Sequence, residues 1–458
     1  MLAVQLLRRD AGLSVAIINN GSAPGRGVAY GTKHSCHLLN VPAGNMSALP
    51  EEPESFLNWA RANHDLQVQA TTFLPRPLYG RYVASLLEEA ARRVQPGAFR
   101  WIQGEASALS RERGHITVKL NDGRKLDTET VVLAAGNFPP AGIPGLPQSS
   151  RRYVASAWSS ANALQGIPQN GNVLLIGSGL TSLDLAIALK TEGFAGHIHI
   201  LSRHGLMPHT HRQTGRWPQF WNAQSPRTIR ALLRLARNQV KAASEAGIDW
   251  HAVIDALRPV TQKIWQSLPL AERKRFLRHV RAYWEVHRHR VAPQIGGTIA
   301  GLIQEGQVRL HAGRITNYRE DQDHAEISLR DRKTGVLSQL RVDRVINCTG
   351  PETDCRRIDD PLIKSLLAQG LAKPDSLFLG LDTDEEGALT GHNGTPSPSL
   401  YAIGPARKSA LWETTAVPEI RVQASRLADH LACILSPKMI RREDRVAPES
   451  AVPLLVSL

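Results

Sequence analysis

The 458-residue chain is poor in cysteine, in acidic side chains and in long apolar runs, and each shortage excludes a class of protein. Its four cysteines lack the paired spacing of metal ligands, so we expect neither a metal site nor a disulfide framework. The most apolar segment, residues 173–189, contains two glycines and Asp184, and it falls short of the ~20 apolar residues of a membrane span. Arg8 and Arg9 follow only a few apolar residues, which is unlike a signal peptide. The sequence therefore predicts a soluble, cytoplasmic protein without a membrane partner.

The shortage of acidic residues leaves a net charge of +14, from 55 basic and 41 acidic side chains. Residues 226–293 alone contain fourteen Lys and Arg against five Asp and Glu. Such a surplus fits a nucleic acid, an anionic membrane surface or a phosphorylated small molecule, and it fits equally an arginine-rich chain with solvated helices. Because zinc-finger spacing and an RNA-binding run of aromatic residues are both missing, we do not expect a nucleic-acid partner.

Apolar segments typical of strands alternate with segments of helical periodicity, which predicts an α/β fold with parallel sheets. Residues 172–176 and 197–202 are the clearest strands, and an apolar helix lies between them. Residues 226–303 show helical periodicity almost throughout and indicate a helical insertion. Residues 139–147 form a proline-rich link, which indicates the first domain boundary.

A dinucleotide-binding fingerprint, with serine in the third glycine position, lies between those two strands. Gly177 permits a tight turn, Gly179 lets a pyrophosphate approach the backbone, and Ser182 occupies the third position. A glycine turn alone is a weak signal, because it can serve only to pack a helix on a sheet. Here the turn follows an apolar strand, opens an apolar helix and leads to another strand, so we expect a nucleotide site.

The residues after the second strand indicate which nicotinamide cofactor is preferred. NAD-binding proteins usually have a carboxylate at this position, whereas an arginine accommodates the 2′-phosphate of NADP. This chain has Ser202, Arg203 and His204 there. Arg203 therefore favours NADP, and NAD stays possible if Arg203 is only an exposed arginine of a basic protein.

Three further apolar segments end in glycine, which suits the close approach of a cofactor or of another backbone. These glycines are Gly136, Gly350 and Gly404. Each signal is weak by itself, since many strands of α/β proteins end in this way. Together with the fingerprint, they form the pattern of flavoproteins that bind two dinucleotides.

Six segments show a family resemblance that spans nearly the whole chain. They are GRGVAYGT (25–32), HLLNVPAGNMS (37–47), PRPLYGRY (75–82), WEVHRHRVAP (284–293), NCTGP (347–351) and LWETTAVPEIR (411–421). The chain resembles the bacterial FAD/NAD(P)-binding oxidoreductase family, which includes FAD-dependent urate hydroxylase-like members. The resemblance implies FAD, a nicotinamide cofactor and two dinucleotide-binding, Rossmann-like domains. It does not imply a particular substrate.

Position by position, the resemblance places Gly25 and Arg26 at the FAD pyrophosphate. It places Gly404 and Pro405, with the helix near Val417, over the ribityl and ring end of the flavin. Glycine-rich turns and helix N-termini do bind pyrophosphates, which agrees with part of this assignment.

The same resemblance implies that the turn 40–47 lines the flavin. The candidate residues of this turn are Asn40, Met46 and Ser47. For Asn40 and Met46, the alternative is an ordered loop in which Asn caps backbone groups.

No catalytic residue is identified from the sequence. Glu413 and Glu419 are the only carboxylates of their segment, and either is a general acid or base or an ion-pair partner of Arg421. His287 and His289 do not share a helix face, so they are not expected to bind one metal ion. The segment 287–290 fits either contact with an anionic group or a solvated helix face.

The resemblance and the boundary at residues 139–147 together predict a domain order. We expect an FAD-binding domain in 1–147 that resumes in 351–436, an NAD(P)-binding domain in 148–225 and 304–350, a basic helical insertion in 226–303, and a tail in 437–458.

An FAD-binding domain of this type should begin with a strand, a glycine turn and a helix. This chain begins within that helix, and its next strand ends in Asn19-Asn20, where the family usually has a carboxylate. We therefore expect the first strand and glycine turn of the FAD domain to be missing from the chain. Either the true start lies upstream of Met1 or the chain is a decayed copy.

The function that these features favour is an FAD-dependent, NAD(P)H-using oxidoreductase, of monooxygenase or hydroxylase type, acting on a small molecule. The alternative is a catalytically silent nucleotide-binding or interaction protein that docks a partner through the basic helical insertion.

Overall fold

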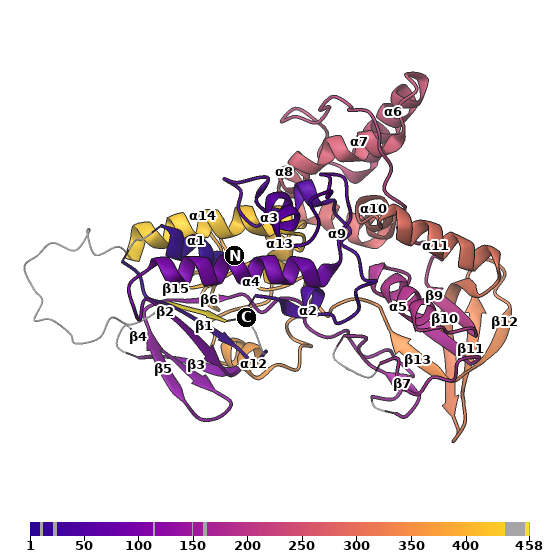
Figure 1. The fold of residues 1–458 in the computed structure, drawn as a ribbon, viewed down its shortest axis with the longest axis horizontal. Coiled ribbons are helices and arrows are strands. Elements are labelled where there is room, and N and C mark those ends of the chain that lie inside the picture. The colour runs from indigo at the N-terminus through magenta and orange to yellow at the C-terminus, as the bar shows by residue number, and fades with distance from the viewer. Residues whose placement is uncertain are drawn as a thin grey trace, which may run out of the picture. The chain divides into compact units, whose positions relative to one another are not determined.

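The computed structural model describes residues 1–9, 12–21, 25–112, 115–148, 150–158, 163–435 and 454–457 (Figure 1). The chain divides into two compact units. Unit 1 comprises Met1–Lys33, Pro42–Phe138 and Glu352–Leu458, and unit 2 comprises His34–Val41 and Pro139–Pro351. The domain boundaries given above stay predictions. Residues 437–453 and 458 of the expected tail lie outside the described residues.

Unit 1 is built on a six-stranded sheet in the order β14-β15-β6-β16-β1-β2. The strands are β14 (Ala388–Thr390), β15 (Pro396–Ala402), β6 (Val131–Leu133), β16 (Leu454–Ser457), β1 (Val15–Asn19) and β2 (Phe99–Gln103). Neighbouring strands run parallel, except that β14 is antiparallel to β15. The carboxyl ends of the parallel strands therefore meet at one edge, where open α/β sheets bind their ligands.

The strand β16 lies between β1 and β6 and pairs with both of them. Leu455 is paired with Ala16 of β1 on one side and with Val131 of β6 on the other. Without a strand between them, β1 and β6 would each present a row of unpaired backbone donors and acceptors. Four residues of the expected tail thus complete the sheet. Whether a strand and a glycine turn precede Met1 stays a prediction.

The two faces of this sheet enter different cores, because successive side chains of a strand point in opposite directions. Val15 and Ile17 pack with helices α1 (Leu2–Arg8), α4 (Arg76–Arg93) and α14 (Val417–Leu435). Ala16 and Ile18 pack with α12 (Pro361–Ala368) and a small antiparallel sheet. That sheet consists of β3 (Ala106–Glu112), β4 (His115–Leu120) and β5 (Lys125–Thr128). Figure 1 shows these layers on opposite sides of β1.

Unit 2 is built on a seven-stranded sheet in the order β12-β11-β10-β9-β8-β13-β7. The strands are β12 (Leu337–Val342), β11 (Ala325–Asp331), β10 (Val308–Glu320), β9 (His197–Ser202), β8 (Asn172–Ile176), β13 (Arg344–Asn347) and β7 (Tyr153–Val154). The last five run parallel, and β11 and β12 continue the sheet as an antiparallel hairpin.

Helices α5 (Leu180–Thr191) and α11 (Pro293–Gln304) cover one face of the parallel strands. Leu183 and Ile299 of these helices share a core with Val173 of β8. On the other face, Leu174 packs with Ile327 of β11. The strand β8 is therefore buried on both faces, as its uninterrupted apolar sequence predicts.

The segment between β9 and α11 confirms the predicted helical insertion. Its helices are α6 (Ile229–Glu245), α7 (Trp250–Leu257), η2 (Arg258–Val260), α8 (Thr261–Ser267), α9 (Leu270–His279) and α10 (Arg281–Arg288). Within the described residues, no helix combines the length and apolarity that crossing a membrane requires. All four cysteines are free thiols, and no group of three or more His, Cys, Asp or Glu among the described residues is placed to hold a metal ion.

One interpretation of the segment 287–290, from its sequence, is a solvated helix face. For the two arginines of this segment that interpretation is wrong, because both are buried. Arg288 and Arg290 are only 4% and 1% exposed. Arg290 donates to the Asp255 carboxylate over 3.1 Å and also to the carbonyl oxygens of His251 and His287. Because a buried charge needs such partners, Arg290 holds the helices of the insertion together.

Candidate nucleotide-binding sites

The turn after β8 depends on an unusually close approach between two strand ends of unit 2. Gly177 has a φ of +114°. A Cβ atom there would lie 2.3 Å from the carbonyl oxygen of Cys348, just after β13. The peptide of Gly177 is fixed further by its N–H, which donates to the Leu201 carbonyl over 2.7 Å. Only glycine fits this position, so the backbone is forced to turn sharply at the carboxyl edge of the sheet.

Two residues later, Gly179 faces open space at the start of α5. Its backbone is extended, and a Cβ atom there would meet nothing within 4 Å. Among the described residues, no side chain caps the N-terminus of α5, and the first turn contains no acidic residue. The unpaired N–H groups and the positive dipole end of α5 therefore remain available to an anion. Ser182 is fully buried, and its hydroxyl donates to the Gly179 carbonyl over 2.8 Å.

The carboxyl end of β9 gathers three basic side chains rather than one. Arg203 is exposed, as its proposed role requires. Arg332, which follows β11, donates to the carbonyl oxygen of Arg203 over 3.2 Å and contacts the ring of His204. Partial burial lowers the pKa of His204, and the nearby Arg332 and Arg203 lower it further. Sequence reasoning missed Arg332, because this residue follows β11 and lies far from Arg203 along the chain.

Gly350 also lies in unit 2, beyond β13, and a Cβ atom there would meet nothing within 4 Å. Asn40 belongs to unit 2 as well, where its carbonyl oxygen lies 2.9 Å from Nε2 of His211. Met46 and Ser47, from the same expected flavin turn, belong to unit 1. The structure therefore assigns the two ends of that turn to different units.

In unit 1, the turn that contains Gly25 and Arg26 packs against α4. A Cβ atom at Gly25 would lie 3.3 Å from Cγ1 of Val83. Arg26 is exposed and precedes the short helix α2 (Gly27–Tyr30). At Gly80 of α4, a Cβ atom would lie 2.6 Å from the carbonyl oxygen of Tyr30. The glycine in PRPLYGRY thus lets α2 approach α4 closely.

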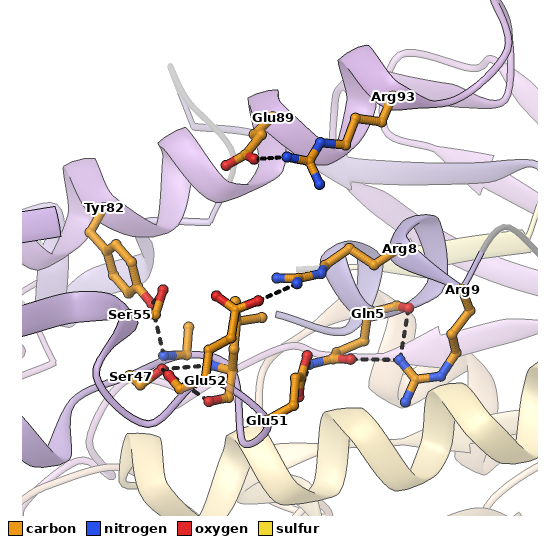
Figure 2. Close-up of polar contacts among 12 residues, drawn as sticks. Gln5, Arg8, Arg9, Ser47, Glu51, Glu52, Ser55, Tyr82, Glu89 and Arg93 are labelled. Carbon is orange, nitrogen blue, oxygen red and sulfur yellow. Dashed lines mark hydrogen bonds and ion pairs between the residues drawn. The ribbon is translucent and has the colours of Figure 1, made fainter. Parts of the chain in front are cut away.

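Met46 and Ser47 are both buried. Figure 2 shows Ser47 within a dense hydrogen-bond network. The Ser47 hydroxyl lies 3.0 Å from the Leu49 carbonyl and 2.6 Å from the Glu52 carbonyl. The Tyr82 hydroxyl donates to Ser55 over 2.9 Å and accepts from the Ala48 N–H. These polar groups are satisfied within the chain, so they shape the loop whether or not a ligand is present.

The glycine after β15 is fixed in the same way. The Gly404 N–H donates to Oε1 of Gln423 over 3.1 Å, and its carbonyl accepts from the Thr414 hydroxyl over 2.6 Å. Gln423 in turn donates to Thr414, and all three residues are buried. Pro405 follows in the 3₁₀ helix η3 (Gly404–Arg407). Gly136, after β6, is exposed and would accept a Cβ atom without contact within 4 Å.

Tyr79 differs from these groups because its buried hydroxyl has no hydrogen-bond partner among the described residues. Its ring is fully buried, with centroids 4.7 Å from Tyr30 and 5.0 Å from Phe56. Nε of Arg421 is also buried and without a partner in the described chain, although Nη1 donates to the Ser47 carbonyl over 3.1 Å. Burial raises the pKa of Tyr79 well above its usual value, and the Arg421 guanidinium opposes that shift. Tyr79 is therefore a neutral phenol with a proton to donate.

The Tyr79 hydroxyl and Nε of Arg421 are among several buried donors of unit 1 that have no partner among the described residues, so both are candidates to bind a polar group of a ligand. Tyr79 lies in PRPLYGRY, which the sequence analysis singled out without assigning a role. Glu413 is buried and Glu419 lies on α14, and their role as acid, base or ion-pair partner stays open.

Comparisons with known proteins agree with this architecture. Residues 1–138 match a family described as FAD-NAD(P)-binding, which confirms the resemblance over that part of the chain. No curated protein matches the chain.

Solved structures match nearly the whole length of both chains. Ornithine hydroxylase PvdA of Pseudomonas aeruginosa is 17% identical, with a TM-score of 0.63 over 95% of this chain and 96% of that one. The cadaverine monooxygenase DfoA of Erwinia amylovora, bound to FAD, is 15% identical, with a TM-score of 0.64 over 98% and 96%. The ornithine N-hydroxylase KtzI of Kutzneria sp. 744, with reduced FAD, NADP+ and L-ornithine, is 14% identical, with a TM-score of 0.60 over 95% and 96%. The predicted fold class is confirmed: the chain has the α/β fold of flavoproteins with two dinucleotide-binding domains.

We expect Gly177→Ala to destabilise the protein by on the order of 3 kcal/mol, because the new methyl group would overlap the Cys348 carbonyl in a backbone conformation that alanine avoids. Gly179→Ala should leave the stability unchanged, because its methyl group would enter open space. Urea unfolding of the two variants compares the same substitution two residues apart. Equal unfolding midpoints would contradict the close approach of the two strand ends.

A larger side chain separates folding from binding at the same turn. We expect Gly179→Val to fold and to bind flavin, but to lose nicotinamide-nucleotide affinity, because the side chain fills the space through which a pyrophosphate approaches α5. Retained NADPH affinity in a folded Gly179→Val protein would remove this site from consideration.

Proposed function

We propose that this protein is a cytoplasmic, FAD-dependent oxidoreductase that uses NADPH and hydroxylates a small molecule. The observation that supports this proposal most directly is the uncapped, open N-terminus of α5 beside the basic end of β9, within a fold shared with flavin monooxygenases. Two nucleotide sites in one chain fit an enzyme that takes electrons from a pyridine nucleotide. A flavin oxidase that is reduced by its own substrate has no use for the second site.

Unit 2 would bind the nicotinamide nucleotide. The N–H groups at the start of α5 suit the pyrophosphate, which approaches through the space beside Gly179. The guanidinium groups of Arg203 and Arg332 suit the 2′-phosphate, because an ionised donor forms a short, strong hydrogen bond with a phosphate oxygen. No carboxylate follows β9 to repel that phosphate.

Unit 1 would bind FAD, which when bound supplies a hydride acceptor that then reacts with dioxygen. Gly25 and Arg26 are our candidates at the pyrophosphate, and Met46 and Ser47 line the flavin. The Tyr79 hydroxyl and Nε of Arg421 fit this group, because both are buried donors without a partner in the described part of the chain. The satisfied network around Gly404 keeps the start of α14 in place without consuming ligand-binding groups.

The experiment that tests this function starts with purified protein reconstituted with FAD. We expect flavin absorbance bands that bleach on anaerobic addition of NADPH and recover with air. Ornithine, lysine and cadaverine serve as amine probes, and a hydroxylated product identified by mass spectrometry assigns the substrate class. NADPH consumption at the level of a buffer control would instead support the catalytically silent interaction protein.

The two arginines at the end of β9 should determine the choice of nucleotide. We expect Arg203→Ala and Arg332→Ala each to lower kcat/KM for NADPH by roughly 10- to 150-fold, the range of hydrogen bonds to charged groups, with little effect on NADH. Lys333→Ala is the matched control, because it removes the neighbouring exposed charge. If the NADPH/NADH ratio is unchanged in both variants, these arginines do not bind the 2′-phosphate.

Two tyrosines three residues apart should respond oppositely to the loss of a hydroxyl. Tyr79→Phe removes an unpaired buried hydroxyl, so the apoprotein should keep or gain stability while FAD affinity falls about tenfold. Tyr82→Phe removes a hydroxyl that bonds Ser55 and Ala48, so it should lower apoprotein stability instead. Thermal unfolding without FAD and fluorescence titration with FAD measure the two effects. An unchanged FAD affinity in Tyr79→Phe would show that Tyr79 does not bind the cofactor.

A further inference from the structure

A groove of about 540 Å³ lies between α6 and α9 on the helical insertion of unit 2. Its apolar lining consists of Ile229 and Leu233 from α6 and Val280 at the end of α9. None of these residues belongs to the nucleotide site at α5 and β9. The groove is therefore a separate feature of the basic segment that the sequence analysis left unexplained.

Arginine side chains from both helices flank the apolar lining of the groove. Arg230, Arg234 and Arg237 occupy positions i, i+4 and i+7 of α6, and Arg275 lies opposite on α9. The three arginines of α6 are exposed and form no ion pair with any described residue. Arg275 pairs with Glu272, whose other oxygen accepts from the Ile229 N–H over 2.7 Å. The groove thus has a strong positive charge that the chain itself does not neutralise.

The arginine face of α6 is not needed to hold the insertion together. The opposite face of the helix makes the internal contacts: Ala243 is fully buried, and Gln239 accepts from the indole N–H of Trp217 over 2.8 Å. A helix that already packs through one face keeps its other face available. Three unpaired guanidinium groups on that face favour an anionic occupant.

We propose that this groove docks an acidic amphipathic helix of a partner protein. An apolar strip flanked by charges at i, i+4 and i+7 is complementary to a helix with an apolar stripe flanked by carboxylates. A nucleic-acid duplex would leave the apolar lining unused, and a flat anionic membrane would not fill a recess between two helices. This inference does not depend on the proposed oxidoreductase activity.

A synthetic peptide tests the proposal with the full-length protein. The probe is a labelled helix of about 17 residues, matching the ~25 Å length of α6, with leucines along one stripe and glutamates beside them. A scrambled peptide of the same composition has the same charge without the stripe. We expect fluorescence anisotropy to show binding of the patterned peptide at least tenfold tighter than that of the scrambled one.

Charge reversal locates the binding site. Arg234→Glu/Arg237→Glu should weaken peptide binding at least tenfold. Lys274→Glu/Arg278→Glu, which makes the same charge change on exposed α9 positions outside the groove, should change it less than threefold. Leu233→Asn should also weaken binding, because it interrupts the apolar lining without altering charge. Circular dichroism and urea unfolding check that each variant folds.

Three outcomes would overturn the proposal. Equal losses in the two charge-reversal variants would mean that binding reflects net charge alone. Tighter binding to phosphatidylserine vesicles than to the peptide, sensitive to the α6 variant, would assign the groove to a membrane surface. Tighter binding to a 20-base-pair DNA duplex, insensitive to Leu233→Asn, would assign it to nucleic acid.

Discussion

The close approach of two strand ends, at Gly177 and Cys348, is the constraint on which the proposed nucleotide site of unit 2 depends. The turn can pass the Cys348 carbonyl only because Gly177 has no side chain. That passage brings Gly179 to the open edge of the sheet and starts α5 with its N–H groups uncapped by described side chains. Since β9 is parallel to β8, its carboxyl end lies at the same edge, which brings Arg203 and Arg332 to the same side. The steric requirement at Gly177 thus positions the helix terminus, and strand pairing positions the basic cluster at the same edge.

The buried polar groups of unit 1 differ in whether neighbouring described residues satisfy their hydrogen bonds. The polar atoms of Ser47, Tyr82 and Gly404 form hydrogen bonds with neighbouring residues, and these bonds fix the loops in the apoprotein. The Tyr79 hydroxyl has no hydrogen-bond partner among the described residues. A buried phenol without such a partner lowers the stability of the fold unless a ligand supplies one. An unsatisfied donor of this kind is tolerated where a ligand completes it. The Tyr79 hydroxyl is therefore our candidate for a ligand contact in unit 1.

The sequence predicted the parallel core well and the polar edges poorly. Residues 172–176 and 197–202 were predicted to the residue, because both strands are apolar and are bounded by glycine or polar residues. The strand β12 was missed, since its side chains are mostly exposed and show no buried alternation. Arg332 and Tyr79 also escaped prediction. Arg332 follows β11 and reaches Arg203 only because β10 pairs with both β9 and β11. Tyr79 is informative only because its hydroxyl is buried. Sheet pairing likewise decides that Leu454–Ser457 lies between β1 and β6.

The interrupted path of unit 1 has a consequence for synthesis on the ribosome. Val131 of β6 pairs with Leu400 of β15, and nearly all of unit 2 lies between them in the chain. Chains emerge from the ribosome N-terminus first, and domains fold as units. All strands of unit 2 are therefore synthesised before β15, the partner of β6, emerges. Until then β6 presents an unpaired edge, the feature that draws nascent chains into aggregation. Unit 2 can fold first as an insert, whereas unit 1 completes its sheet only after β15 and β16 have been synthesised.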